Sequence, residues 1–183
     1  MGIGGVRLLR ALGHGRLRRF HMNEGHAALI VLALLEERLA GRAGRATAPD
    51  LAALREACVF TTHTPVPAGH DAFPADLAER LLGKATWARL GELGQGADLN
   101  MTTLALGRAR FTNAVALPHA RTSERLFPGH TIPAITNGVH AATWAAPSLQ
   151  ELFDRRMPGW RSDAYVLRHA LGIPPQEIWA AHA

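Results

Sequence analysis

The order of strand-like and helix-like runs in the first third of the chain constrains its fold most strongly. A short β-type run at 17–22 precedes an Ala- and Leu-rich helical run at 27–39 and a second helix from about 50 to 57. A second β-type run, 58–62, follows at once. Strands connected through helices lie parallel in one sheet, so this order predicts an α/β layer with a parallel sheet.

The rest of the chain is predicted to be helical, with proline- and glycine-rich connections. Residues 63–74 contain three prolines and a glycine and are predicted to lack regular structure. A short strand is expected at 132–135. Further helices are expected at 75–82, 86–90, 101–111 and, in pieces, over 148–183.

The formal net charge of +5 comes almost entirely from dispersed arginines, because Lys84 is the only lysine. The one dense basic stretch is Arg16, Arg18 and Arg19. Nucleic-acid binding requires a basic patch, so the dispersed arginines argue against it. The net positive charge itself is equally compatible with a small anionic substrate such as phosphate.

Composition also limits the compartment. Cys58 is the only cysteine, which excludes a disulfide framework and a cysteine-based zinc site. The longest apolar run, 27–35, is too short to span a bilayer, and the sequence begins without a secretory pattern. We therefore expect no membrane partner and a cytoplasmic location.

Polar residues gather where the first predicted strand ends, at 21–26. Glu24 and His26 project near the start of the following helix, a position that favours hydrogen bonds to hydroxyls or anions. The alternative is that Asn23 or Glu24 only caps the helix.

The loop after the second predicted strand contains His63 and Thr64 among prolines that stiffen it. A histidine beside threonine hydroxyls suits the recognition of sugar hydroxyls. A metal site is the rival, since four histidines, Glu24 and Asp71 lie in these two loops. None of the well-attested metal-ligand spacings is present, so no metal is expected. The four histidines are His21, His26, His63 and His70.

A third polar set comprises Asn113, after the predicted helix at 101–111, and the stretch 136–140. The Asn137-Gly138 pair by itself indicates only a turn.

Taken together, these segments resemble the glycogen and maltodextrin phosphorylase family, especially its shorter bacterial and archaeal α-glucan phosphorylases. The matching stretches run in the family's order through nearly the whole chain. They are 2–7, 21–28, 61–73, 100–106, 113, 136–144 and 167–182, the last including Ile178-Trp179-Ala180-Ala181-His182.

The resemblance implies part of a two-lobed GT-B glycosyltransferase fold, with an active site between two Rossmann-like domains. Residues 1–112 would end the N-terminal lobe, and 113–183 would cross to and begin the C-terminal lobe. The implied reaction is phosphorolysis of a terminal α-1,4-linked glucose, which yields glucose 1-phosphate with retained configuration. Pyridoxal 5′-phosphate serves as an acid–base group in that family, which agrees with the lack of a carboxylate pair suited to hydrolysis.

The resemblance also implies roles for individual residues. His63 and Asn113 would hydrogen-bond the transferred glucosyl unit, and Glu24, His26 and Thr64 would line the sugar pocket. Asn137 and His140 match a motif with a structural role.

Some positions depart from the family pattern. Ala114 stands where glycine is usual, Pro118-His119-Ala120 replaces Leu-His-Gly, and Ser123-Glu124 replaces Ser-Arg. Ala114 adds a Cβ at a position where glycine would permit close backbone approach or a positive φ. Because Ala114 follows Asn113 directly, sugar contact by Asn113 is less well supported than sugar contact by His63.

The cofactor lysine of the family has no counterpart here, because Lys84 lies outside any cofactor motif. Met1 enters in the middle of a Leu-Gly-Ile-Gly-Gly pattern, which indicates a truncated start. We therefore expect this chain alone to be inactive. The resemblance also implies that the complete enzyme is allosteric and can form a homo-oligomer. The alternatives are a glucan-binding remnant without chemistry and a metal-dependent hydrolase. Splitting two lobes also exposes apolar surface, which predicts self-association.

Overall fold

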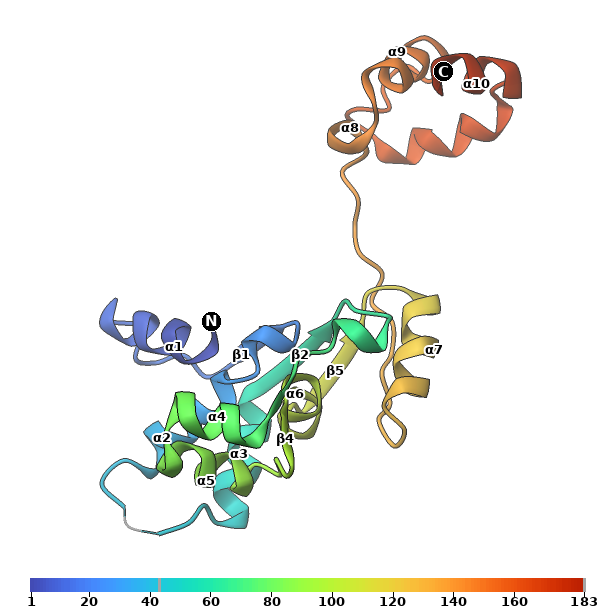
Figure 1. Cartoon of the computed structure of the whole chain (residues 1–183). Helices are drawn as coiled ribbons and strands as arrows, with labels where there is room; N and C mark the ends of the chain where they lie inside the picture. Colours follow the sequence, from blue (N-terminus) through green and yellow to red (C-terminus); the bar gives the residue numbers. More distant parts are fainter. Residues whose placement is uncertain (43, 183) are drawn as a thin grey trace. The chain divides into compact units, whose positions relative to one another are not determined.

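A computed structural model describes residues 1–42 and 44–182 of the protein. The chain forms two compact units, Met1–Thr136 and Asn137–Ala183, shown in blue to orange and in orange to red in Figure 1. The units divide after Thr136, whereas Asn113 lies inside the sheet of the first unit. The expected crossing between lobes at 112/113 refers to a larger protein and stays a prediction.

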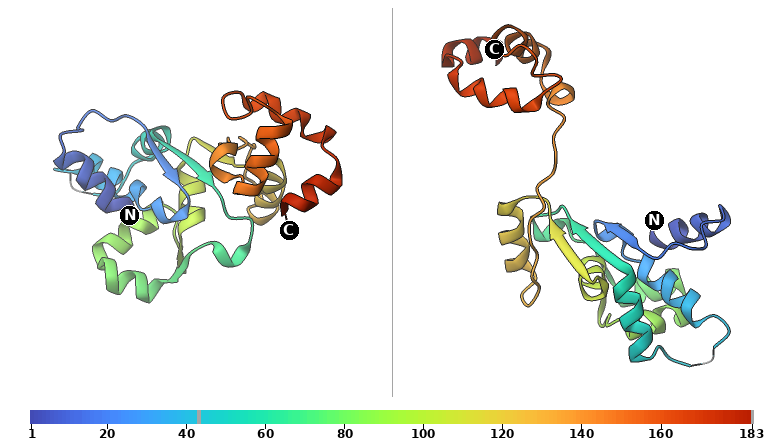
Figure 2. Two further views of the ribbon diagram at one scale, coloured as in Figure 1. Left: turned by 90° about the horizontal axis from the view of Figure 1, so that it is seen from above. Right: turned by 180° about the vertical axis from the view of Figure 1, so that it is seen from behind.

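Three parallel strands form the sheet of the first unit. They are β1 (Phe20–Asn23), β2 (Cys58–Thr62) and β5 (Phe111–Ala114), with β2 in the middle (Figure 2). The register pairs Asn23 with Thr61 and Thr61 with Asn113, so all three strands end at the same edge. The sheet confirms the predicted α/β class.

One face of this sheet is buried along its whole length. Side chains alternate between faces along a strand, and the buried set is largely apolar. Helices α3 and α6 pack against the central strand on the core side, and α2 joins them in the same core. The buried face consists of Phe20, Met22, Cys58, Phe60, Thr62, Thr112 and Ala114.

The opposite face carries polar groups toward the carboxyl ends of the strands. His21 and Asn23 on β1 are exposed, while Thr61 and Asn113 on β2 and β5 are buried.

Among the helices of the first unit, α2 and α3 follow the predicted pattern closely, whereas α1 and α7 were not predicted. Helix α3 begins with a capping box in which Thr47 and Asp50 bond each other's backbone, and Pro49 lies in the first turn. The helices are α1 (Gly2–Ala11), α2 (Ile30–Leu39), α3 (Ala48–Ala57), α4 (Ala75–Leu82), α5 (Lys84–Glu92), α6 (Met101–Arg108) and α7 (Leu117–Leu126), with 3-10 turns η1 (Gly25–Ala27) and η2 (Pro67–Gly69).

Several element predictions were wrong. Residues 63–74 do hold regular structure, namely η2 and the strand β3 (Ala72–Pro74), which pairs with β4 (Asp98–Asn100). Pro74 is tolerated because it closes a strand of a two-stranded ribbon. The expected helix at 101–111 ends at Arg108, and Phe111 begins β5. The expected strand at 132–135 is a single bridge between Ala134 and Ala114.

The second unit is helical in pieces, as predicted. Its core consists of Leu152, Met157, Trp160 and Ile173. The glycine and proline pairs at 158–159 and 174–175 separate its segments, which are α8 (Ala141–Trp144), α9 (Pro147–Arg156), η3 (Ala164–Gly172) and α10 (Pro175–His182). Across residues 1–42 and 44–182, every helix is too short or too polar to cross a membrane.

Candidate functional site

The loops that follow β1 and β2 meet at the carboxyl edge of the sheet. The backbone N–H of Glu24 donates to the carbonyl oxygen of Thr61 at 2.9 Å, which extends the pairing one residue past β1. Ligands of open parallel sheets bind outside this edge, so the loops after the strands form the candidate site.

The carboxylate of Glu24 connects the two loops. Its Oε2 atom accepts hydrogen bonds from the backbone N–H of His63 at 2.7 Å and from the hydroxyl of Thr64 at 2.9 Å. Its Oε1 atom accepts from the backbone N–H of Gly25 at 3.0 Å. Glu24 therefore caps the 3-10 turn η1, whereas the main helix α2 begins after Leu29 without a side-chain cap. The same carboxylate also holds the predicted residues His63 and Thr64 in place.

The backbone of Glu24 is strained. With φ 71° and ψ 165°, it is the one non-glycine residue with positive φ in the described part of the chain. This region is essentially restricted to glycine, and a side chain there costs about 1–3 kcal/mol. Such strain persists where the surroundings impose it and is concentrated at functional sites, so the conformation supports a functional role for this loop.

His63 presents a free imidazole from a fixed backbone. Its side chain is exposed and has no hydrogen bond among the described residues, whereas its N–H is held by Glu24. The neighbouring Thr64 packs on Gly69, where an added Cβ would lie 2.4 Å from the Thr64 Cγ2 atom. Glycine at 69 therefore allows the loop to close on Thr64.

Asn113 lies at the same edge but is 8% exposed and already hydrogen-bonded. Its Oδ1 atom accepts from the Thr61 hydroxyl at 2.8 Å, and its Nδ2 atom donates to the carbonyl oxygen of Ala114 at 3.1 Å. The Thr61 hydroxyl also lies 2.7 Å from Nε2 of His21. Ala114, which replaces the usual glycine, sits in β5 without positive φ, so its methyl group causes no backbone strain.

Sequence reasoning did not include Thr61 and His21 among the site residues. Both occur in stretches that it had examined, but their contact depends on the register of β1 against β2. The sequence offered one signal for Thr61, since it lies near the end of β2, two residues before His63 in the loop that follows.

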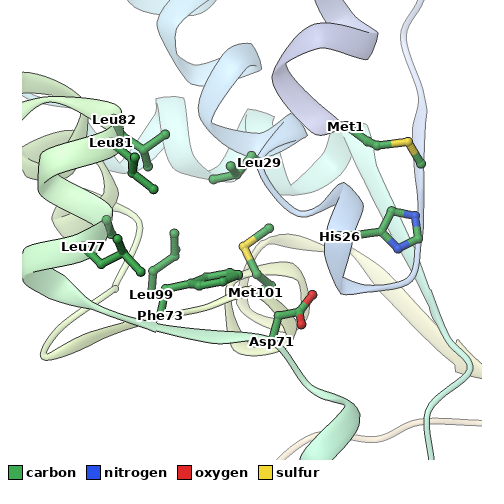
Figure 3. Close-up of a pocket in the computed structure, with 11 residues that line it drawn as sticks. Met1, His26, Leu29, Asp71, Phe73, Leu77, Leu81, Leu82, Leu99 and Met101 are labelled. Carbon is green, nitrogen blue, oxygen red and sulfur yellow. The ribbon is translucent and has the colours of Figure 1, made fainter.

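His26 does not join the group around Glu24. It lines a separate cavity of about 290 Å³ together with Met1 and Asp71. Figure 3 shows these three toward one end of the cavity, and apolar side chains such as Phe73 and Leu77 line the other end. A cavity of this composition favours an apolar occupant over a polyol, so the structure gives the predicted sugar contact of His26 no direct support.

Other potentially reactive groups lie in or near these loops. Nδ1 of His70 lies 2.9 Å from the hydroxyl of Thr102. In the described part of the chain, no three His, Cys, Asp or Glu side chains are grouped to hold a metal ion. Burial raises the pKa of Cys58 to about 12, which keeps this thiol protonated and unsuited to nucleophilic chemistry.

Known proteins are similar to this chain along its whole length, although no protein-family model matches it. Maltodextrin phosphorylase of Thermococcus litoralis is 37% identical over 206 residues, which cover 100% of this chain and 24% of that protein. Glycogen phosphorylase of Mycobacterium tuberculosis is 36% identical over 97% of the chain and 24% of its own length. Glycogen phosphorylase of Aquifex aeolicus is 27% identical over 100% of the chain. The chain thus spans about a quarter of the length of the first two relatives.

Proposed function

We propose that this chain, which belongs to the glycogen and maltodextrin phosphorylase family, is part of a protein that phosphorolyses the terminal α-1,4-linked glucose of a glucan. The reaction releases glucose 1-phosphate with retained configuration. Its chain folds as a two-lobed glycosyltransferase, of which this stretch contributes the end of one lobe and the crossing to the next. Similarity to maltodextrin phosphorylase along the entire chain is the observation that carries the proposal.

Within that reaction, the carboxyl edge of the sheet binds the glucosyl unit. The exposed imidazole of His63 and the amide of Asn113 hydrogen-bond sugar hydroxyls. Glu24 and Thr64 keep the His63 loop at a fixed position through the 2.7 Å and 2.9 Å bonds to the carboxylate. Polar groups held rigidly before the reaction stabilise an oxocarbenium-like transition state without a cost of reorganisation.

Pyridoxal phosphate, which the family implies, does not fit the residues described here. Attachment requires a lysine amine, and the single lysine, Lys84, begins α5 and belongs to none of the loops that directly follow β1, β2 and β5. We derive no step through the cofactor. Its attachment is assigned to a part of the family's length that this stretch does not span.

Because Lys84 lies outside these loops, glucan binding without chemistry is the property that we expect of the 183 residues by themselves. The polar groups around Glu24 do not depend on a cofactor for their geometry. Because an opposing lobe would supply much of the burial of a sugar, binding by this stretch is expected to be weak.

Glucan binding is tested by titrating the ¹⁵N-labelled chain with maltoheptaose, an α-1,4-linked oligosaccharide. Backbone amide shifts should move at Glu24, His63 and Thr64. Cellohexaose, which has β-1,4 linkages, is the matched ligand control and should leave them unchanged. Equal shifts with both sugars, or shifts confined to other regions, would contradict the site.

Chemistry is tested in a chimera. The corresponding quarter of the Thermococcus litoralis enzyme is replaced by this sequence, and glucose 1-phosphate release from maltodextrin is measured. The chimera should be active, and His63→Ala should lower kcat by about 100-fold or more, as expected for loss of a transition-state contact. His169→Ala, at an exposed position of the second unit, is the control and should change kcat little. A folded chimera that binds maltoheptaose but releases no glucose 1-phosphate would contradict phosphorolysis.

A further inference from the structure

We propose that His21 and Thr61 are positioning residues that fix the side-chain amide of Asn113, so that it offers an N–H group to a sugar hydroxyl. This inference rests on the proposed function for its ligand. The hydrogen-bond chain itself crosses all three strands and is defined by the structure alone. It comprises His21 on β1, Thr61 on β2 and Asn113 on β5.

The direction of the chain follows from its last member. Nδ2 of Asn113 lies 3.1 Å from the carbonyl oxygen of Ala114, and a carbonyl can only accept. The same oxygen accepts the backbone N–H of Ile135 at 2.8 Å, so it is held in place by a second segment. A rotated amide would turn Oδ1 toward this oxygen and lose the bond. The nitrogen of the amide therefore faces Ala114, and Oδ1 faces Thr61.

The other two members are then determined in turn. The Thr61 hydroxyl has one hydrogen, and it donates to Oδ1 of Asn113 at 2.8 Å. At the His21 contact of 2.7 Å the hydroxyl can only accept, so Nε2 of His21 carries a hydrogen. An Nδ1–H tautomer of His21 would present a lone pair there and draw the Thr61 hydrogen away from Asn113.

This arrangement leaves one particular group of Asn113 for a ligand. Oδ1 is engaged by Thr61, and one hydrogen of Nδ2 is engaged by Ala114. The second hydrogen of Nδ2 has no partner among the described residues. Since Asn113 is 8% exposed, a ligand that met Oδ1 instead would leave a buried donor unsatisfied. The chain of bonds therefore selects a hydroxyl that accepts at this position.

Amide orientation is measured first, by NMR on the ¹⁵N-labelled 183-residue chain without ligand. Two N–H groups that donate to one oxygen bring their hydrogens within about 4 Å of each other. We expect nuclear Overhauser effects between the Nδ2 hydrogens of Asn113 and the backbone N–H of Ile135, and an Nε2–H ring for His21. Contacts from Nδ2 to the Thr61 methyl without any to Ile135, or an Nδ1–H ring of His21, would overturn the proposal.

Binding is measured second, with maltoheptaose and paired variants. Thr61→Val keeps the branched shape but removes the hydroxyl, and we expect about tenfold weaker binding, the usual consequence of one lost oriented hydrogen bond. Thr61→Ser restores the hydroxyl and should bind within about twofold of the unchanged chain. His21→Phe should weaken binding in the same direction as Thr61→Val, whereas His169→Phe should not.

The two measurements separate this inference from the proposed function. If the unchanged chain shows the expected amide orientation but no maltoheptaose binding, glucan binding by this stretch fails and with it the ligand assigned to Asn113, while the chimera still decides phosphorolysis. If it binds maltoheptaose and Thr61→Val binds equally well, the positioning role fails while the proposed function stands. If Thr61→Val does not fold, the amide orientation of the unchanged chain still decides the proposal.

Discussion

The two compact units of the chain are stabilised in different ways. In Met1–Thr136, the core joins strands that are distant in sequence, and a layer of helices covers one face of the sheet. In Asn137–Ala183, the described residues include four fully buried apolar side chains, between Leu152 and Ile173, with partly buried ones packed against them. A large core can support local strain such as that of Glu24, because many other contacts offset its cost. A core with so few fully buried side chains leaves little such reserve.

Trp160 is the centre of the smaller core. It is 2% exposed, and its indole N–H donates to Asp154 at 2.8 Å. Phe153 packs edge-on against its ring, with centroids 5.2 Å apart. One side chain thus supplies a large part of the apolar burial and a satisfied polar contact in this unit.

The largest expected effect is therefore that of Trp160→Ala. Removal of a buried aromatic side chain costs about 3–5 kcal/mol, which should unfold the second unit. Hydrogen exchange should show amides of α9 and α10 losing protection while those of β1, β2 and β5 keep it. Trp144→Ala, at a residue 78% exposed, is the control and should change little. Equal loss of protection in both units would show that they unfold as one body.

In the first unit, Gly2→Ala should have the next largest effect. An added Cβ would lie 2.4 Å from the backbone nitrogen of Ile30, so α1 must move away from the start of α2. Overpacking of this kind costs about 1–3 kcal/mol. Gly4→Ala on the same helix meets nothing within 4 Å and should stabilise α1 slightly, since alanine is the better helix former. Chemical denaturation of both variants measures the difference, and equal midpoints would contradict the close packing.

The strain at Glu24 can be isolated by comparing two variants that both lack the carboxylate. Glu24→Ala keeps a side chain at φ 71°, whereas Glu24→Gly removes it. We expect the glycine variant to be more stable by about 1 kcal/mol. This difference is the free energy gained by relieving the backbone strain, minus the cost of ordering the more flexible glycine on folding. Denaturant midpoints measure this difference. An alanine variant as stable as the glycine variant would show that the first unit does not store strain here.

The smallest expected effect is a pH dependence at the start of α3. Hydrogen bonds from Arg42, and then from Thr47, hold the pKa of Asp50 well below its usual range. A carboxylate with a lowered folded pKa contributes its stability above the unfolded pKa of about 4, and that contribution is lost as the pH falls through the folded value. Because the arginine partners are half-exposed, water screens the interaction.

Thermal unfolding of Asp50→Asn checks this expectation. The variant should melt below the unchanged chain at pH 7, and the gap should narrow as the pH falls from about 4 toward 2. Glu151→Gln, at an exposed residue of the second unit, is the control and should show no such convergence. A gap that stays constant with pH would mean that Asp50 acts through the cap geometry and not through its charge.

Local patterns predicted much of the first unit. The capping box at Thr47 and Asp50, the β-type run of β2 and the helix α4 were all visible in short windows of sequence. The strand β5 was not, because the predicted helix at 101–111 included Phe111, and the three residues that remained were too few to show a period. The helix α7 was also missed, since Pro118 in its first turn resembles a break although it is a favoured start.

The sequence by itself determined the α/β class, the relationship to glucan phosphorylases and the position of His63 and Thr64 after a strand. Each of these depends on residue types at short spacing or on motifs in a fixed order. Only the tertiary structure decided that Glu24 holds both loops, that His26 lines a different cavity and that Thr61 connects His21 with Asn113. These contacts join residues 39 to 52 positions apart or depend on how helices surround a cavity. Strand register and packing decide such contacts, and neither is encoded in any short window of the chain.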